Sequence, residues 1–184
     1  DLLESTFGKN SISRVEGDDY HKWERGNKNW KTYTHLNPLA NKLNIMSNHI
    51  KSLVEGKSVF KEHYDHSTGF FTEPKKIDPQ KTVIIQGLHS FYPRNIRDLI
   101  DLKIFLSPDE NLRLAWKLSR DQKKRGHSKE AVLKSLKDRE KDSYKHILPQ
   151  KDYADWIIEL KTAEDFNWEN PKENFESEIK VNHI

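Results

Sequence analysis

Three clusters of polar residues contain the side chains best suited to chemistry. They are Asp18-Asp19-Tyr20-His21, Tyr64-Asp65-His66 and Gln86-Gly87-Leu88-His89. A carboxylate at the end of a strand can take a proton from a hydroxyl nucleophile, or hold Mg²⁺ directly or through water. Aspartate pairs are also common in turns and helix caps, and taken alone the pair Asp18-Asp19 favours that structural explanation.

Basic and aromatic side chains alternate between residues 21 and 33. His21 and Arg25 are four residues apart, and the rings of Trp23, Trp30 and Tyr33 could form the wall of a pocket. Arginine matches phosphate oxygens with two parallel hydrogen bonds, so this segment could bind a phosphorylated or polyhydroxylated substrate. The alternative, which is commoner for such a segment by itself, is a solvated charged loop.

A cationic helix is expected over residues 109–126. Its basic residues are Lys117, Arg120, Lys123, Lys124 and Arg125. Lys117 and Arg120 lie one turn apart on the side expected to pack, and basic groups near a core can neutralise charge during phosphoryl transfer. The pair Asp121–Arg125 could instead be a surface ion pair worth roughly a few tenths of a kcal/mol. The sequence Arg-Gly-His-Ser at 125–128 separates two helices and could form a mobile lid.

These groups must be positioned by strands and helices that alternate along the chain. Strands are expected over residues 12–16, 58–60, 82–85, 101–106 and 154–160, with a possible last strand over 177–181. Helices are expected from Asn37-Pro38 to Gly56, from a capping box at Ser107-Pro108-Asp109-Glu110 to about residue 126, and from Ser128 to Pro149. This alternation indicates an α/β domain around a mainly parallel sheet, whose functional loops follow the strands.

The composition restricts the class of protein. The chain has 184 residues, enough for one sizeable core, and its 32 basic residues nearly balance 29 acidic residues to give a net charge of +3. This charge is too small to indicate a nucleic-acid partner by itself. The absence of cysteine excludes a disulfide scaffold, a Cys-ligated metal and a thiol nucleophile. With no apolar run that approaches a membrane span and no signal-peptide pattern, we expect a cytoplasmic protein without a membrane partner.

The first eleven residues of the chain contain a helix end without a helix start, and a stretch that partly matches a phosphate-binding motif. Residues 1–8 have the pattern of the last turns of a helix closed by Gly8, without a helix start, so we expect the sequence to begin within a domain. The stretch Gly8-Lys9-Asn10-Ser11 is not a P-loop, because that motif needs G-x-x-x-x-G-K-[ST] after a strand.

Six stretches in order resemble the phosphoribulokinase and uridine kinase family of P-loop kinases. They are D-D-Y-H (18–21) with Arg25, T-H-L-N-P-L-A-N (34–41), Y-D-H-S-T-G (64–69), Q-G-L-H (86–89), W-K-L-S-R-D-Q-K-K-R-G-H-S (116–128) and L-P-Q-K-D-Y-A-D (148–155). Together they cover most of residues 12–160. The motifs at 64–66, 125–128 and 149–155 make the chain look closer to phosphoribulokinase than to uridine kinase.

The resemblance implies a three-layer P-loop NTPase-type fold with a mainly parallel sheet, here without its first strand and P-loop. It implies transfer of the γ-phosphoryl group of ATP, with Mg²⁺, to a hydroxyl of a sugar or sugar phosphate. We expect a kinase-like domain over residues 1–162, and a C-terminal extension over 163–184 that could add a strand to it. A homodimer is possible, and the missing P-loop suggests that the chain is part of a longer polypeptide.

The resemblance also implies roles for single residues, assigned by position. Asp18 looks like the catalytic base, and Asp18 with Gln86 is the candidate metal-binding pair. The candidate substrate contacts are His21, Arg25, Tyr64 and His66. Lys117, Arg120 and Asp121 look like the catalytic group that stabilises the transferred charge, and Arg120 with Arg125 like the residues that close over the nucleotide.

Two departures from the family pattern affect the expected activity. Without the P-loop, this stretch of chain alone should bind ATP poorly. Family members usually have glutamate where Gln86 stands, and an amide offers a carbonyl oxygen but no charge, so metal affinity should fall. The basic residues after Arg25 are also spaced differently, which puts ribulose 5-phosphate in doubt as the acceptor. The alternative hypothesis is a catalytically impaired kinase-like domain that serves as a binding module.

Overall fold

The computed structural model describes residues 5–6, 8, 10–125, 128–168, 171 and 175–181, without the side chains of 123–125. Backbone contacts divide the chain into two compact units, Asp1–Ile100 and Asp101–Ile184. The helix end expected over residues 1–8 falls largely outside the described residues. Within the described part of the chain, no helix has the length and apolar character needed to cross a lipid bilayer.

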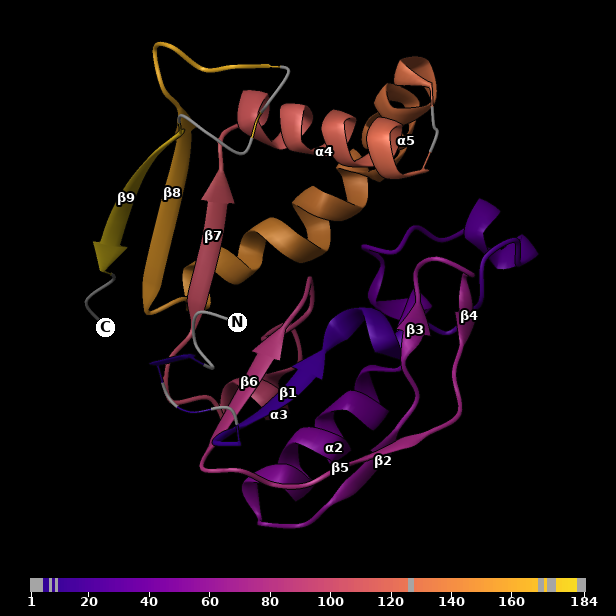
Figure 1. Ribbon diagram of the computed structural model, residues 1–184, viewed down its shortest axis with the longest axis vertical. Helices are drawn as coiled ribbons and strands as arrows, with labels where there is room; N and C mark the ends of the chain where they lie inside the picture. Colours follow the sequence, from indigo (N-terminus) through magenta and orange to yellow (C-terminus); the bar gives the residue numbers. More distant parts are fainter. Residues whose placement is uncertain are drawn as a thin grey trace. The chain divides into compact units, whose positions relative to one another are not determined.

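The first unit is built on two parallel strands that end at the same level. Strand β1 (Ile12–Glu16) pairs with β6 (Thr82–Gln86) in a register that runs from Ile12↔Thr82 to Glu16↔Gln86 (Figure 1). Helix α2 (Leu43–Val54) packs against both strands. The buried core of this unit consists of Val15, Tyr20, Met46, Ile50, Leu53, Val59 and Ile96. The parallel pair confirms the α/β character expected from the sequence.

Two small antiparallel pairs extend the first unit. Strand β2 (Val59–Lys61) pairs with β5 (Lys75–Ile77), and β3 (Tyr64–Asp65) pairs with β4 (Phe70–Phe71). The turn between β3 and β4 carries part of the Y-D-H-S-T-G stretch at 64–69, whose first two residues form β3. Strands β4 and β5 were not expected, because each has only two or three residues and a sequence rich in lysine or aromatic residues without clear alternation.

The predicted start of the first helix at Asn37-Pro38 is wrong. Asn37 instead caps a short 3₁₀ helix, Pro38–Ala40, by accepting a hydrogen bond from the Leu39 amide at 3.0 Å. Asn41 then adopts an extended conformation and forms a β-bridge with His21, which interrupts the helical path. The helix therefore begins only at Leu43, and the short helix α3 (Arg94–Arg97) completes the unit.

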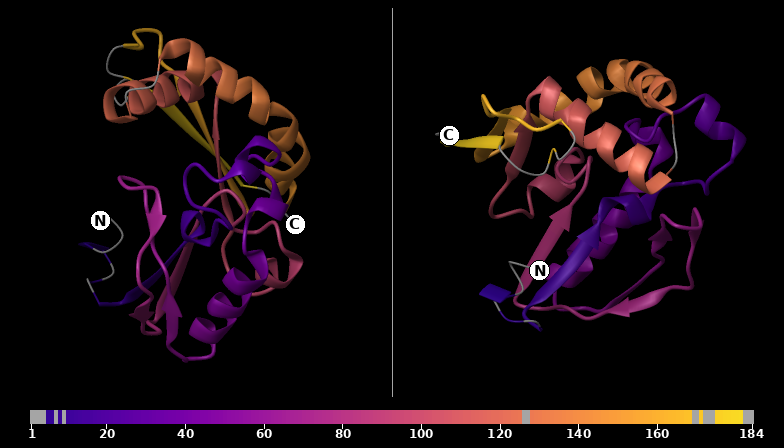
Figure 2. Two further views of the ribbon diagram at one scale, coloured as in Figure 1. Left: turned by 90° about the vertical axis from the view of Figure 1, so that its right-hand side faces the viewer. Right: turned by 45° about the horizontal axis from the view of Figure 1, so that its top comes forward.

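The second unit contains a three-stranded sheet. Strand β7 (Ile104–Pro108) runs parallel to β8 (Trp156–Thr162), and β9 (Phe175–Val181) pairs antiparallel with β8 (Figure 1). Helices α4 (Glu110–Arg125) and α5 (Lys129–Asp142) pack on each other, and α4 contacts β8 (Figure 2).

The boundaries of the α4 region differ from the predicted capping box. Ser107 and Pro108 belong to strand β7, and Asp109 caps the helix by accepting a hydrogen bond from the Leu112 amide at 2.7 Å. The other carboxylate oxygen of Asp109 accepts from the Thr162 amide at 2.9 Å, so the same side chain joins the helix start to β8. Ser128 caps α5 as predicted, with its hydroxyl oxygen 3.2 Å from the Ala131 amide.

Helix α5 ends before the predicted stop at Pro149. The regular helix finishes at Asp142 and continues as a π-helical turn, Ser143–Ile147, and then as a 3₁₀ helix, Leu148–Tyr153. Pro149 lies near the start of the 3₁₀ helix, where its missing N–H is not needed.

Candidate active site

The candidate site lies at the carboxyl ends of β1 and β6, where two glycines bring the chain segments together. Gly87 has φ +147°, and a Cβ atom added to it would lie 2.9 Å from the Gly17 Cα. A Cβ on Gly17 would lie 3.2 Å from the Gly87 Cα. Since these contacts are to backbone atoms that cannot move aside, both positions favour glycine. The close approach brings together the segments that carry Asp18 and Gln86.

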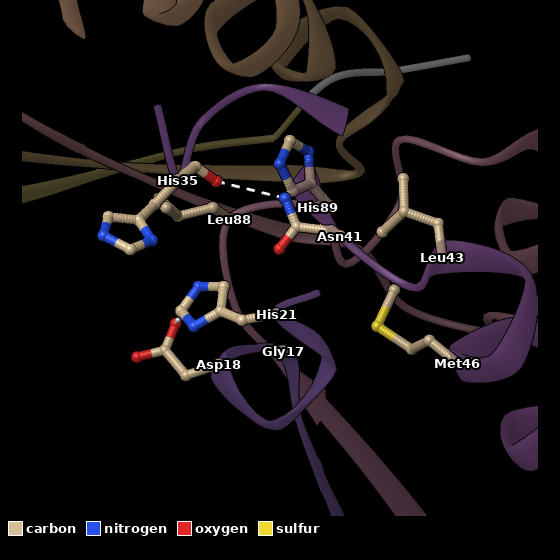
Figure 3. A pocket seen from close by; sticks show the side chains of 9 residues that line it. All are labelled: Gly17, Asp18, His21, His35, Asn41, Leu43, Met46, Leu88 and His89. Atoms are coloured by element: carbon tan, nitrogen blue, oxygen red, sulfur yellow. Dashed lines mark hydrogen bonds and ion pairs between the residues drawn. The ribbon is translucent and has the colours of Figure 1, made fainter. Parts of the chain in front are cut away.

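Asp18 lies on the 3₁₀ helix Gly17–Tyr20 directly after β1, and its carboxylate faces two histidines. Its Oδ2 is 3.1 Å from the His66 Nε2, and its Oδ1 is 4.0 Å from the His21 Nε2. The Asp18 side chain is 50% exposed, whereas His21 is buried. Figure 3 shows Asp18 pointing toward His21 in a narrow pocket that is also lined by His35. The fold therefore brings together three predicted site residues in a position open to a ligand.

Aromatic rings pack against the two histidines that face this carboxylate. The ring of Tyr64 makes edge contacts with His21, at 5.4 Å between centroids, and with His66, at 5.1 Å. Trp30 contacts His21 at 5.7 Å. Trp23 packs against both Trp30 and Tyr33, at 5.2 and 5.7 Å. The rings of Trp23, Trp30 and Tyr33 therefore pack together, but none of them lines the pocket beside Asp18, so their role as a pocket wall stays a prediction. Tyr64, a predicted substrate contact, is buried against His21 and His66.

The side chain of Arg25 braces the turn that carries His66. Its guanidinium donates to the carbonyl oxygens of His66 at 2.6 Å and Ser67 at 3.3 Å. The Arg25 amide also donates to the Gly69 carbonyl at 2.9 Å. An arginine has five N–H donors, so these contacts leave donors that could bind an anionic group. The structure therefore gives Arg25 a structural role that the sequence did not indicate.

Asp65 stabilises the same turn and stays ionised. Its carboxylate accepts hydrogen bonds from the Ser67 amide at 2.8 Å, the Ser67 hydroxyl at 2.6 Å and the Thr68 hydroxyl at 3.0 Å. The hydrogen bonds from Ser67 are the main reason that the pKa of Asp65 is lowered to about 2. The Tyr64-Asp65-His66 cluster thus divides into two ring-bearing residues that face the site and one aspartate that shapes the turn.

Gln86, the predicted metal ligand on β6, interacts with the neighbouring strand. Its side-chain nitrogen donates a hydrogen bond to the Glu16 Oε1 at 3.1 Å, across the last rung of the β1–β6 pair. The amide oxygen is not used in this contact, so it can still accept a ligand. Glu16 supplies a carboxylate next to the position where the family usually has one. Sequence reasoning did not single out Glu16, although its place as the last residue of β1 was predicted.

A second network surrounds Asp19, whose side chain is only 1% exposed. Its Oδ1 accepts from the Tyr64 amide at 2.8 Å and lies 2.9 Å from the His63 Nδ1, while its Oδ2 forms an ion pair with Lys61. Burial lowers the pKa of Lys61, and the carboxylate of Glu16 acts in the opposite direction. Sequence reasoning treated Asp19 only as part of an aspartate pair, because its partners are more than 40 residues away.

The remaining predicted catalytic residues lie on α4 in the second unit. The Lys117 ammonium donates to the Ser135 hydroxyl at 3.2 Å, and the Arg120 Nε donates to the Asp121 Oδ1 at 2.9 Å. Asp121 is buried. Burial, followed by repulsion from Arg139, lowers the pKa of Lys117 to about 8. The side chain of Arg125, and residues 126 and 127 of the predicted lid, lie outside the described part of the chain.

Comparison with known proteins decides the family. A family model described as "Phosphoribulokinase / Uridine kinase family" matches residues 8–167. The chain belongs to this family. Phosphoribulokinase from Synechocystis sp. is 37% identical over 158 residues, which are 86% of this chain and 48% of that protein. Uridine kinase from Clostridium perfringens is 30% identical over 158 residues, 83% of this chain and 75% of that protein.

The solved structure of a phosphoribulokinase from Rhodobacter spheroides has the same fold. The two superpose with a TM-score of 0.75 at 23% identity, over 92% of this chain and 67% of that one. These matches confirm the family resemblance and the P-loop kinase type of fold expected from the six motifs. The chain spans about half the length of the Synechocystis phosphoribulokinase.

Proposed function

We propose that the protein containing this chain is an ATP-dependent kinase that phosphorylates a hydroxyl of a sugar phosphate. The observation that carries the proposal is the carboxylate of Asp18 at the end of a parallel strand, 3.1 Å from His66 and open to a ligand, in a chain of this kinase family. A carboxylate in this place can accept the proton of the attacking hydroxyl as the hydroxyl oxygen bonds to the γ-phosphorus. The bond from the γ-phosphorus to the bridging oxygen breaks in the same step, and ADP leaves with that oxygen.

The acceptor is held by the groups around Asp18. His66 orients the carboxylate through its Nε2, and we assign His66 and His21 to contacts with hydroxyl or phosphate oxygens of the sugar phosphate. The N–H donors that Arg25 does not use for the turn match a phosphate group. The ring of Tyr64 forms the wall against which the sugar lies. The buried rings of Tyr64 and His21 also keep water from competing with the acceptor for the phosphoryl group.

The α4 group stabilises the charge that is transferred. Phosphoryl transfer spreads negative charge over the equatorial oxygens of the moving group, and nearby fixed cations lower the energy of that state. Lys117 and Arg120 are these cations, with Asp121 orienting Arg120. We assign Arg125 to the same group, as a residue that closes over the nucleotide. Residues 163–184 form an extension that adds β9 to the kinase-like domain of residues 1–162.

The oxygens at the strand ends suit Mg²⁺, which prefers carboxylate and carbonyl ligands. Asp18 and Gln86 would hold the ion, Gln86 through the amide oxygen that the hydrogen bond to Glu16 does not use. Glu16 adds negative charge beside Gln86, which offsets part of the charge lost with the family's usual glutamate. Bound Mg²⁺ would neutralise charge on the phosphates of ATP.

The direct test is an ADP-release assay on the longest natural polypeptide that contains this sequence. The acceptors are pentose and hexose phosphates, free sugars and nucleosides, with ATP and Mg²⁺ in excess. We expect ADP release that depends on one sugar phosphate. Release that depends only on a free sugar or nucleoside would contradict the substrate class, and ATP binding without acceptor-dependent release would contradict the kinase assignment and favour a binding module.

A further inference from the structure

The carboxylate of Asp19 contacts the segment that leads to His66. Asp19 is buried, and its Oδ1 accepts a hydrogen bond of 2.8 Å from the Tyr64 amide. The same oxygen lies 2.9 Å from the His63 Nδ1. The backbone amide of Tyr64 and the side chain of the preceding residue, His63, thus contact one carboxylate on the 3₁₀ helix after β1.

His66 lies two residues beyond Tyr64 and contacts the neighbour of Asp19 in sequence. Its Nε2 is 3.1 Å from the Asp18 Oδ2. The adjacent carboxylates of Asp18 and Asp19 therefore hold the same turn at two points, one through a side chain and one through the backbone. A shift of the Tyr64 amide would move His66 relative to Asp18.

We propose that Asp19 is a positioning residue, which places His66 against Asp18 by fixing the backbone of Tyr64. Only the predicted effect of Asp19 on catalysis rests on the proposed function. The geometry itself depends on contacts within the first unit. Arg25 supports the same turn from the other side by donating to the His66 carbonyl.

The charge around Asp19 favours this role over a metal site. Among the described residues, Glu16, Asp19 and His63 form one group whose possible ligand atoms lie within 4.8 Å of one another. However, the Lys61 ammonium already forms an ion pair with Asp19, and its side chain is only 10% exposed. A fixed buried cation repels a metal ion at the same carboxylate. Lys61 thus provides the positive charge that allows Asp19 to be buried.

The first experiment measures the geometry without using activity. In the full-length protein we compare the wild type with the double variant Lys61→Met/Asp19→Ala, which removes both members of the ion pair so that neither is left buried without a partner. NMR should show that the double variant loses hydrogen-exchange protection at the Tyr64 amide and shifts the ring resonances of His66. Lys61→Met/Asp19→Asn keeps an oxygen for the Tyr64 amide and leaves no lysine unpaired, so it should retain both signals. If the alanine variant does not fold, loss of either signal in this asparagine variant would overturn the proposal.

Asp78→Ala is the matched control for this experiment. Asp78 also accepts a side-chain hydrogen bond, from Ser58 at 2.6 Å, and pairs with Lys76 at 2.7 Å. It precedes β6, at the opposite end of the strands from the site. This variant should leave the His66 resonances unchanged. Unchanged His66 resonances in Lys61→Met/Asp19→Ala, or a loss in Lys61→Met/Asp19→Asn as large as in the alanine variant, would overturn the proposal.

The second experiment separates positioning from general stability by a double-mutant cycle in kcat/KM for the sugar phosphate. Replacing Lys61 and Asp19 together by Met and Ala should lower kcat/KM by about 100-fold relative to the wild type, as for other small misplacements of a catalytic group. In a His66→Ala background the same change should cost less than about threefold, because the two residues act through one path. Equal losses in both backgrounds would overturn the proposal. A wild-type protein without kinase activity would refute the proposed function, while the NMR result would still decide the role of Asp19.

Discussion

The amide nitrogen of Gln86 lies 3.1 Å from the carboxylate oxygen of Glu16, across the last rung of the β1–β6 pair. The hydrogen bond explains how an amide fits at a position where the family usually has an acid. Two carboxylates at this separation would repel each other unless a proton or a cation lay between them. Gln86 therefore keeps the end of the sheet stable without bound metal, and it contributes an oxygen rather than a charge to any metal.

We expect Gln86→Glu to lower the Mg²⁺ concentration needed for half-maximal rate and to reduce thermal stability in the absence of Mg²⁺. The added carboxylate would strengthen metal binding but would face Glu16 when no metal is present. Mg²⁺ should therefore raise the Tm of the variant more than that of the wild type, as measured by differential scanning fluorimetry. The double variant Glu16→Gln/Gln86→Glu is the control, because it restores a single charge to the pair. An unaltered Mg²⁺ dependence would show that residue 86 does not contact the metal.

We expect Gly69→Ala to destabilise the protein and to raise KM for the sugar phosphate. Gly69 has φ +84°, and an added Cβ would lie 2.5 Å from the Arg25 Cβ, an atom that cannot move without its backbone. The left-handed conformation alone costs an alanine about 1–2 kcal/mol, and the clash with Arg25 adds to it. The displaced guanidinium would also lose its place beside His66.

Gly56→Ala is the control that separates the cost of the left-handed backbone from the cost of the clash with Arg25. Gly56 has φ +78°, but an added Cβ would meet no atom within 4 Å. Gly56→Ala should therefore lose only the free energy of unfolding that the left-handed backbone costs, as measured by urea unfolding. Its KM for the sugar phosphate should not change. If both variants lost the same free energy of unfolding, the close contact between Gly69 and Arg25 would be disproved.

The pKa of Lys117 predicts a fall in activity at alkaline pH. Burial lowers this pKa from 10.5 to about 8, with smaller effects from Arg139, Arg120 and Arg113 against the attraction of Asp121. If the charged ammonium stabilises the transferred phosphoryl group, kcat/KM should fall by about tenfold per pH unit above pH 8. Lys117→Arg stays charged over this range and should lose the alkaline decline. If kcat/KM of the arginine variant fell with the same midpoint pH as that of the wild type, the alkaline decline would belong to a group other than Lys117.

The same shift has a defined effect on stability. Because the folded-state pKa lies below the unfolded value, the unfolded chain binds more protons between about pH 8 and 10.5. Burial of the charged lysine therefore lowers the free energy of unfolding below pH 8. This loss of stability becomes smaller as pH rises from about 8 to 10.5 and Lys117 loses its proton in the folded state. Relative to Lys117→Met, the wild type should gain stability from pH 8 to 10 in urea unfolding. A constant difference across this range would exclude the shift.

The sequence predicted β1, the parallel arrangement, the α/β class and the family, because strand alternation and ordered motifs are local signals. It could not predict that Arg25 contacts the His66 carbonyl, that Asp19 binds the Tyr64 amide, or that Gln86 pairs with Glu16. These contacts join residues between 41 and 70 positions apart, and they depend on the fold. The predicted helix start at Asn37 was wrong for a similar reason. The β-bridge of Asn41 to His21, also distant in sequence, decided the local conformation.

The most direct test of the central claim is acceptor-dependent ADP release by Asp18→Asn in the full-length protein, compared with Asp98→Asn. Asp98 is an exposed carboxylate of the same unit, paired only loosely with Arg94 at 3.9 Å. Asp18→Asn should lower kcat by at least about 100-fold, since the base is lost, while ATP binding measured by calorimetry stays within about threefold. Asp98→Asn should match the wild type in both. Turnover by Asp18→Asn equal to that of the wild type would contradict the assignment of Asp18 as the base.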